Sequence, residues 1–211
     1  MNHLEYINYL KDKLLENFLS LTTKDKAMER FNHSLGVMKM AGRLALIYRP
    51  NDLEFHNKCE IAGLLHDYGK FYKVQDYLEL TKVNNIDFKY DAVYNQVYHG
   101  YYGYLGVKRD LKINDNDILM AIRNHIMGAP LMSLIEEIIY VADLIEEGRN
   151  EIDIPIVKPL RKLALDGNLK EAVAFEAKHV VSHLIDRNIP IHPESLGCYN
   201  GYIKYLKKEN V

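Results

Sequence analysis

The chain has 211 residues, which is enough for one substantial hydrophobic core and few for two, so we expect a single domain. Its formal net charge of −2 gives no electrostatic reason to expect nucleic acid or an anionic membrane surface as a partner. Two cysteines, Cys59 and Cys198, are too few for a disulfide framework, which indicates a reducing compartment.

The N-terminal residues lack the basic and apolar regions of a secretory signal. No stretch approaches the ~18 consecutive apolar residues of a membrane-spanning helix. We therefore expect a cytoplasmic protein with no membrane partner.

Apolar residues at helical spacing predict three helices in the first third of the chain. The first has its apolar stripe at Leu4, Ile7, Leu10, Leu14 and Leu15. The second runs from Thr22 to about Tyr48 and carries His33 on an apolar face. The third spans about residues 55–68 and carries His66 at its end.

Helical periodicity weakens between Phe71 and Tyr98, which predicts a short helix followed by a loop of the kind that forms lids. His99 then opens a stretch in which small residues would let another helix approach closely. Asp115 supplies acceptors at the start of the next helix, and His125 continues the buried stripe of that helix.

The C-terminal third also has helical periodicity. Ser133 and Glu136 predict a capping box ahead of a helix whose buried stripe runs into Asp143. Two more amphipathic helices follow, with stripes at Val173, Ala177, Val180, Val181 and Leu184 and at Leu196, Tyr199, Ile203 and Leu206. No β-alternation of useful length occurs, so we expect an all-α fold.

The motif at residues 64–70 reads Leu-Leu-His-Asp-Tyr-Gly-Lys. His66 continues the buried stripe of its helix and is followed directly by Asp67. Burying an imidazole beside a carboxylate is costly unless a metal or a hydrogen-bonding partner compensates. Gly69 follows where a left-handed residue would end the helix, and Lys70 places a cation beside the predicted site.

Six side chains with metal-binding chemistry lie on or beside apolar or small-residue helical faces. They are His33, His66, Asp67, His99, His125 and Asp143. For any one of them alone, a hydrogen-bonded core residue is the commoner interpretation. Burying all six on separate elements without a common partner would need many independent compensations, so a shared metal centre is favoured.

The donor set indicates which metals fit. Imidazole and carboxylate without thiolate suit iron, manganese, zinc or a mixed site rather than a structural cysteine–zinc site. Six ligands exceed the number that a single catalytic metal typically takes. If Asp67 bridges two metals, the other ligands divide into His33, His66 and Asp143 at one and His99 and His125 at the other. Two metals ~3.5–4 Å apart suit displacement at phosphorus.

His33, the His66–Asp67 pair and Asp143 form an H…HD…D pattern that resembles the signature of the HD-domain metal-dependent phosphohydrolases, an all-helical superfamily. The short sequence motifs around these residues narrow the resemblance to one family within the superfamily. They are Arg30-Phe31-Asn32-His33, Leu64-Leu65-His66-Asp67-Tyr68-Gly69-Lys70, His99-Gly100, Ala121-Ile122-Arg123-Asn124-His125 and Ile139-Tyr140-Val141-Ala142-Asp143-Leu144-Ile145-Glu146. Over about residues 28–188 the chain resembles the YqeK-type HD family, whose members are symmetrical diadenosine tetraphosphate hydrolases.

The resemblance implies an HD-domain helical bundle with two metal ions, usually iron, on residues matching all six candidates. Manganese, zinc or magnesium are the alternatives. It also implies a nucleotide substrate, diadenosine tetraphosphate, that is cleaved centrally to two ADP. The chain departs from the family pattern at Gly69, Glu147 and Ile126, which bears on substrate fit more than on metal binding. We expect an N-terminal helix (residues 1–22), a metal-binding core (about 23–150) and C-terminal helices (about 151–211).

Spacing and resemblance together suggest a mechanism in which metal-activated water attacks an inner phosphorus. Asp67 and Lys70 are then catalytic, and Lys70 and Arg149 bind the polyphosphate oxygens as cations. The alternative for Arg149 is a helix C-terminal cation that faces water. Arg30 and Arg123 stay open between reaching the site and pairing with nearby acids.

His179 and His183 are i, i+4 neighbours that could share a metal. The chain has no H-E-x-x-H pattern around them. Glu176, Asp186 and Arg187 lie on the same helical face, so we expect a solvated polar surface there.

Three functions remain compatible with the sequence. The first is a dinuclear-metal hydrolase of dinucleoside polyphosphates. The second keeps the same site for a nucleoside mono- or triphosphate, and the third is a metal-stabilised sensor that binds nucleotide without turnover. Metal identity, base preference, regulatory partners and oligomeric state stay open, a homodimer being one option.

Overall fold

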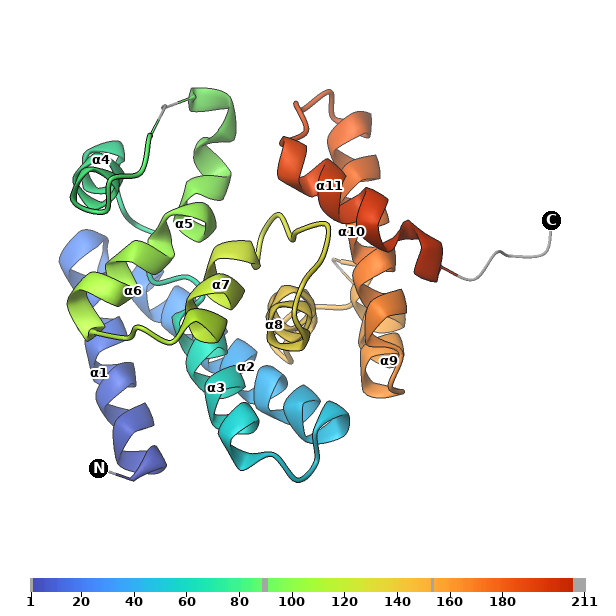
Figure 1. Cartoon of the computed structure of the whole chain (residues 1–211), viewed down its shortest axis with the longest axis horizontal. Helices are drawn as coiled ribbons and strands as arrows, with labels where there is room; N and C mark the ends of the chain where they lie inside the picture. Colours follow the sequence, from blue (N-terminus) through green and yellow to red (C-terminus); the bar gives the residue numbers. More distant parts are fainter. Residues whose placement is uncertain (1, 89–90, 153, 207–211) are drawn as a thin grey trace.

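A computed structural model describes residues 2–88, 91–152 and 154–206 as helices joined by turns and loops, with no strand among these residues (Figure 1). This confirms the all-α prediction. The α-helices are α1 His3–Leu21, α2 Lys24–Tyr48, α3 Leu53–Leu65, α4 Val74–Val83, α5 Tyr98–Tyr101, α6 Gly103–Leu111, α7 Asn116–Asn124, α8 Leu134–Ile145, α9 Val157–Leu165, α10 Leu169–Asp186 and α11 Pro193–Tyr202. The 3-10 helices are η1 Ala92–Val97 and η2 Ile203–Tyr205.

α2 and α3 pack closely side by side, and α7 and α8 pack against them. The close approach depends on Gly63, because an added Cβ there would lie 3.0 Å from the backbone oxygen of Val37 on α2. Fully buried side chains from all four helices fill the space between them, among them Leu44, Leu64, Ile122 and Ile138. The candidate site forms at the ends and inner faces of these four helices.

Two predicted helix starts are confirmed by hydrogen bonds. The carboxylate of Asp115 accepts hydrogen bonds from the backbone N–H groups of Asp117 and Ile118, at 2.9 and 3.2 Å. The backbone N–H of Ser133 donates to Glu136 Oε2 at 2.8 Å. These caps fix where α7 and α8 begin, and thereby which residues reach the site at their other ends.

The prediction that Gly69 ends α3 as a left-handed residue is wrong. α3 ends at Leu65, three residues before its predicted end, and the glycines with left-handed backbone among the described residues are Gly128 and Gly167. Gly69 instead touches the backbone of Gly103, where an added Cβ would lie 2.8 Å from the Gly103 Cα atom. The small residues after His99 therefore leave room for the turn that follows α3 rather than for another helix.

The C-terminal helices α9, α10 and α11 pack together, with α10 also against α8. The predicted stripe of the last helix is wrong at Leu196, which is 43% exposed. The buried face is formed by Ser195, Cys198 and Tyr202. Tyr202 sets this orientation, because its hydroxyl donates to the carboxylate of Glu137 at 2.8 Å.

The predicted polar face of α10 is solvated at His179 and His183, which are exposed. It is not solvated at Glu176, which is 5% exposed and whose Oε2 atom has no hydrogen-bond partner within the described part of the chain. Burial, followed by the charge of Asp143, raises the pKa of Glu176 well above its usual value. Glu176 is therefore a buried neutral acid.

In the described ranges, no helix combines the length and apolar character needed to cross a membrane. The cytoplasmic location and the division into one domain with residues 1–22, about 23–150 and about 151–211 as its parts stay predictions.

Candidate metal centre

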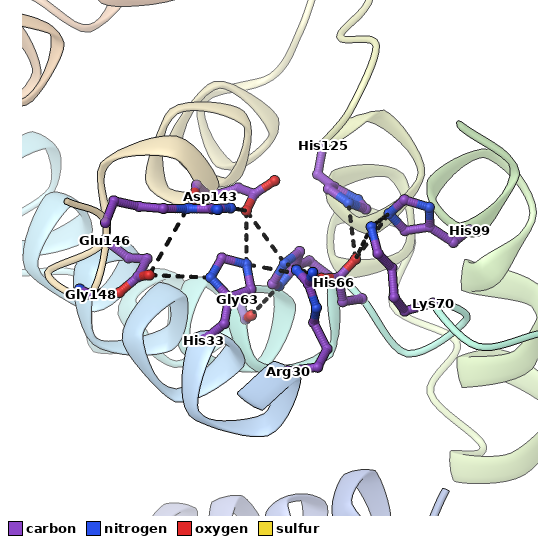
Figure 2. Close-up of polar contacts among 12 residues, drawn as sticks. Arg30, His33, Gly63, His66, Lys70, His99, His125, Asp143, Glu146 and Gly148 are labelled. Atoms are coloured by element: carbon purple, nitrogen blue, oxygen red, sulfur yellow. Dashed lines mark hydrogen bonds and ion pairs between the residues drawn. The ribbon is translucent and has the colours of Figure 1, made fainter. Parts of the chain in front are cut away.

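Five elements bring the six candidate ligands to one place inside the helical core (Figure 2). The ligands are His33 from α2, His66 and Asp67 from the end of α3, His99 from α5, His125 from the end of α7 and Asp143 from the last turn of α8. Figure 2 shows the four imidazoles and the Asp143 carboxylate directed toward one another. The side chains predicted from sequence thus converge, although up to 110 residues separate them.

Asp67 lies at the centre of the cluster and its side chain is 2% exposed. Its Oδ2 atom is 3.3 Å from His66 Nε2 and 3.9 Å from His33 Nε2. Its Oδ1 atom is 3.0 Å from His99 Nε2 and 3.8 Å from His125 Nε2. The two carboxylate oxygens therefore face two different pairs of histidines.

Asp143 closes the cluster at one end. Its Oδ1 atom lies 2.9 Å from His33 Nε2 and 3.7 Å from His66 Nε2. Three sets of ligand atoms each lie within 4.8 Å of one another: His33, His66 and Asp67; His66, His125 and Asp143; and Asp67, His99 and His125. The first and third sets share Asp67, whereas the second joins His125 of one predicted half to His66 and Asp143 of the other. The division of the ligands between two metals stays a prediction.

Backbone carbonyl groups fix the orientation of two histidines. His66 Nδ1 donates to the carbonyl of Gly63 at 2.8 Å, and His125 Nδ1 donates to the carbonyl of Ile122 at 2.7 Å. Each imidazole then presents the lone pair of Nε2 to the cluster. Both Nε2 atoms are buried and make no hydrogen bond to the described residues. Buried acceptors without donors fit a site that holds divalent cations.

The surroundings of His99 and His125 favour the neutral imidazole, which can bind a metal. Burial, reinforced by the neighbouring His66, lowers the pKa of His125 to about 3. Burial also lowers the pKa of His99, although Asp67 acts in the opposite direction. Both imidazoles are thus neutral near pH 7, which is the form that coordinates a metal.

The two aspartates are ionised. Burial opposes the charged form of Asp67, but the neighbouring His66 and His99 outweigh it and hold the pKa of Asp67 well below its usual value. For Asp143, burial is likewise outweighed, here by His33, whose Nε2 lies 2.9 Å from Oδ1, and by the neighbouring His66, so the pKa of Asp143 is also lowered. The cluster therefore offers neutral nitrogen donors at His99 and His125 together with anionic oxygen donors at Asp67 and Asp143.

Glu146 belongs to the site and was given no role from the sequence. It is 5% exposed, and its Oε1 atom lies 3.2 Å from His33 Nδ1 while its Oε2 accepts from the Gly148 N–H at 2.6 Å. An added Cβ at Gly36 would lie 2.3 Å from Oε2, so glycine makes room for this carboxylate. The spacing of three residues from Asp143 on one helix is the signal that could have identified it.

Lys70 and Arg149 both reach the cluster. Lys70 Nζ lies 3.1 Å from His99 Nε2, and Arg149 Nη2 lies 3.1 Å from Asp143 Oδ1. Their side chains are 28% and 30% exposed. Arg149 therefore does not simply face water, and the two cations stand at the two ends of the ligand cluster.

The structure also places the two arginines that the sequence left open. Arg30 reaches the site, where its Nη1 donates to Asp67 Oδ2 at 2.8 Å. Arg123 pairs with Glu194 at 3.1 Å, and its guanidinium lies 4.1 Å from the centroid of the Tyr101 ring. Arg30 is therefore a group of the metal centre, and Arg123 is held by neighbours outside it.

A cavity of about 290 Å³ adjoins the His33 side of the cluster. Its walls include Arg30, Asn32, Glu146 and Arg149. Two guanidinium groups and two carboxylates, those of Glu29 and Glu146, line this hollow beside the metal-binding side chains.

The helical core and its converging H…HD…D residues define the class of protein, an HD domain. The sequence profile described as "HD domain" matches residues 30–148. The chain belongs to the HD domain family of metal-dependent hydrolases, in the branch that contains the curated symmetrical bis(5'-nucleosyl)-tetraphosphatases.

Curated relatives support this placement over most of the chain. The proteins named "Bis(5'-nucleosyl)-tetraphosphatase, symmetrical" from Halalkalibacterium halodurans and Bacillus subtilis are each 32% identical to it, over 184 and 185 residues. These alignments cover 86% and 88% of this chain and 93% and 95% of the relatives. A crystal structure from Clostridium acetobutylicum, described as a predicted HD superfamily hydrolase involved in NAD metabolism, is also similar. It has a TM-score of 0.76 and 34% identity, and the match covers 92% of this chain and 96% of that one.

Proposed function

We propose that this chain hydrolyses diadenosine tetraphosphate symmetrically, giving two molecules of ADP. The names of the curated relatives support the reaction. The observation that carries the proposal is the position of Asp67, whose two oxygens face separate histidine pairs. That arrangement suits a centre with two cations, which is a common solution for displacement at phosphorus.

The proposed cofactor is a pair of metal ions, iron first and manganese, zinc or magnesium as alternatives. The six residues that would hold them are His33, His66, Asp67, His99, His125 and Asp143. When bound, the ions supply activated water and neutralise charge on the phosphoryl oxygens. The nitrogen-rich donor set favours iron, manganese or zinc over magnesium.

The protein's own groups bind and orient the polyphosphate. Lys70 at the His99 end and Arg149 at the Asp143 end are placed to bind its phosphate oxygens as charge-assisted donors. Water then forms a bond to one inner phosphorus, and the bond from that phosphorus to the central bridging oxygen breaks. Each half leaves as ADP, and two protons go to solvent.

Product analysis tests the reaction. Metal-loaded protein is incubated anaerobically with diadenosine tetraphosphate, and the nucleotides are separated by ion-exchange chromatography. We expect ADP alone, in a two-to-one ratio to the substrate consumed. AMP with ATP would contradict central cleavage, and faster release of phosphate from nucleoside mono- or triphosphates would favour the second function. Thermal stabilisation by nucleotide without any cleavage would favour the sensor.

A further inference from the structure

A second cavity, of about 330 Å³, lies between α4 and α6. These two helices pack together at the edge of the molecule opposite the C-terminal helices (Figure 1). None of the residues that line this cavity is a candidate metal ligand, and none lines the cavity beside His33. We propose that the cavity is a second nucleotide-binding site, which takes one purine nucleoside phosphate and has no part in the hydrolysis.

Part of the cavity lining is apolar. Leu80 from α4 and Leu105 from α6 line it and are each 2% exposed. Val83 lines it as well and is 79% exposed, so it presents an apolar surface to water. A planar aromatic base that packs on Val83 and the two leucines removes this surface from water, which is favourable.

The lining is also rich in positive charge. It includes Lys108, Arg109 and Lys112 but only one carboxylate, that of Glu79. Asp110 holds the Arg109 guanidinium through two contacts of 2.6 and 2.9 Å. The two lysines form no ion pair within the described part of the chain. A pair of ammonium groups without a carboxylate partner suits a phosphate group, because lysine binds phosphate as a compact positive charge.

One of these ammonium groups is held in place by the backbone. Lys112 follows the last residue of α6 and has a left-handed backbone, with φ at 56°. Its Nζ atom donates to the carbonyl of Arg109 at 2.7 Å. This hydrogen bond uses one of the three donors of the ammonium group and leaves two for a ligand.

Hydrogen-bond acceptors complete the lining. Asn84 and Asn114 each use the side-chain NH₂ group on a backbone carbonyl, that of Leu80 at 2.7 Å and that of Lys112 at 3.0 Å. The amide oxygens of both asparagines and the carboxylate of Glu79 are then the acceptors that the cavity offers. The amino group of a purine donates to such acceptors, whereas an alkyl carboxylate brings no donor. This favours a nucleotide over a fatty acid.

The volume sets the number of nucleosides. Small-molecule sites in proteins range from roughly 300 to 1,000 Å³. A cavity of about 330 Å³ is at the lower end of that range and suits a single nucleotide rather than a dinucleoside polyphosphate. The site therefore differs from the metal centre in the size of its ligand as well as in its residues.

The basic residues have a simpler explanation, which makes the opposite prediction. Lysine and arginine in the last turn of a helix complement the partial negative charge of its C-terminal end and face water. If that were their whole role at α6, replacing Lys108 and Lys112 would leave nucleotide binding unchanged.

The experiment is photolabelling of the metal-loaded full chain with 8-azido-ADP, followed by tryptic digestion and mass spectrometry. The Lys108→Gln/Lys112→Gln double variant removes both unpaired charges. The Lys158→Gln/Lys178→Gln double variant is the matched control, because it changes the net charge equally at two exposed lysines of α9 and α10. Parallel samples contain excess ADP or excess decanoate as competitor.

We expect label on α4 and on residues 105–114, in addition to label around His33, and excess ADP should prevent both. Lys108→Gln/Lys112→Gln should reduce the label on α4 and residues 105–114 about tenfold. It should leave the label around His33 and the hydrolysis rate unchanged. The control variant should match the unmodified protein.

Label confined to the surroundings of His33 would overturn the inference, as would an α4 label that the Lys108→Gln/Lys112→Gln variant keeps in full. Displacement of the α4 label by decanoate but not by ADP would show a site for apolar anions and contradict the nucleotide. If the chain does not cleave diadenosine tetraphosphate, the proposed function fails, while the label on α4 and residues 105–114 still decides this second site.

Discussion

Asp67 connects the two halves of the cluster through the two oxygens of its carboxylate. A substitution of Asp67 should therefore remove more bound metal than a substitution of a ligand that belongs to one half. Asp67→Asn replaces one oxygen with an NH₂ group that cannot bind a metal. We expect this variant to lose most of both metals. His125→Ala removes one ligand of the proposed metal at His99 and His125. We expect this variant to bind about half as much metal and to lose most of its activity.

Metal content per chain after desalting, measured by inductively coupled plasma mass spectrometry, checks these expectations. His179→Ala is the control, because this exposed histidine lies outside the cluster. Full metal content in Asp67→Asn would show that the carboxylate does not bridge.

Glu176 should make the stability of the protein depend on pH. In the unfolded chain a glutamate has a pKa of about 4.3, while burial raises the pKa of Glu176 in the folded protein well above that range. Between the two values the folded protein binds the extra proton, so the free energy of unfolding falls as pH rises through this window. Glu176→Gln cannot ionise and should be more stable than the unmodified chain at pH 8, by about 1–3 kcal/mol, with the difference shrinking toward pH 4.

Urea unfolding of the metal-free proteins between pH 4 and pH 8 measures this difference. Glu147→Gln serves as the matched control, since the Glu147 side chain is 77% exposed. Equal pH profiles for Glu176→Gln and the unmodified chain would mean that Glu176 is ionised in the folded state.

At the residue scale, the ligands could be predicted from the sequence, but most of the groups that orient them could not. The polar residues at His33, His66 and His125 stood out because they interrupt apolar faces. The carbonyl that orients His66 lies three residues earlier on the same helix and follows from helical geometry. The carboxylate that orients His33 comes from Glu146, 113 residues away, and no local pattern specifies that contact.

At the scale of elements, the contact between Gly69 and Gly103 sets where α5 and α6 sit relative to the end of α3. Gly69→Ala would place a Cβ 2.8 Å from the Gly103 Cα atom, so the backbone carrying His99 must move. We expect a loss of about 1–3 kcal/mol of stability and weaker metal binding at the His99 side.

Gly42→Ala on α2 is the matched control for this substitution. The atoms nearest to an added Cβ there belong to the side chains of Glu60 and His56, at 3.1 Å or more, and alanine favours a helix. Thermal unfolding and metal titration of the two variants separate the effects. A Gly69→Ala protein that matches Gly42→Ala in both measurements would contradict the role assigned to this contact.

Helix positions followed from periodicity and capping, which are local properties, and the starts at Asp115 and Ser133 agree with the sequence analysis. The buried face of α11 could not be predicted from periodicity. The hydrogen bond between Tyr202 and Glu137 orients the helix so that Leu196 is exposed. The end of α3 was placed too late, since a glycine selected for close packing resembles a glycine that ends a helix.

At the scale of the whole molecule, the metal centre joins five elements from separate parts of the chain, so metal binding should stabilise the entire fold. A ligand at one hundred times its Kd that binds only the folded state adds about 2.7 kcal/mol. For a chain of this size, that corresponds to a rise in Tm of roughly 5–10 °C. Scanning fluorimetry with chelator, and again after Mn²⁺ is restored, measures the shift. An unchanged Tm would contradict a shared centre.

The gathering of the ligands could be expected from the sequence because six buried polar groups need partners. The order in which they meet, with Asp67 in the middle and Asp143 at one end, depends on how α2, α3, α7 and α8 cross, and periodicity does not encode those crossings.

Anomalous diffraction from crystals of the iron-loaded protein tests the central claim most directly. The account predicts two anomalous peaks about 3.5–4 Å apart, one beside each oxygen of Asp67. A single peak, or peaks away from Asp67, would contradict it.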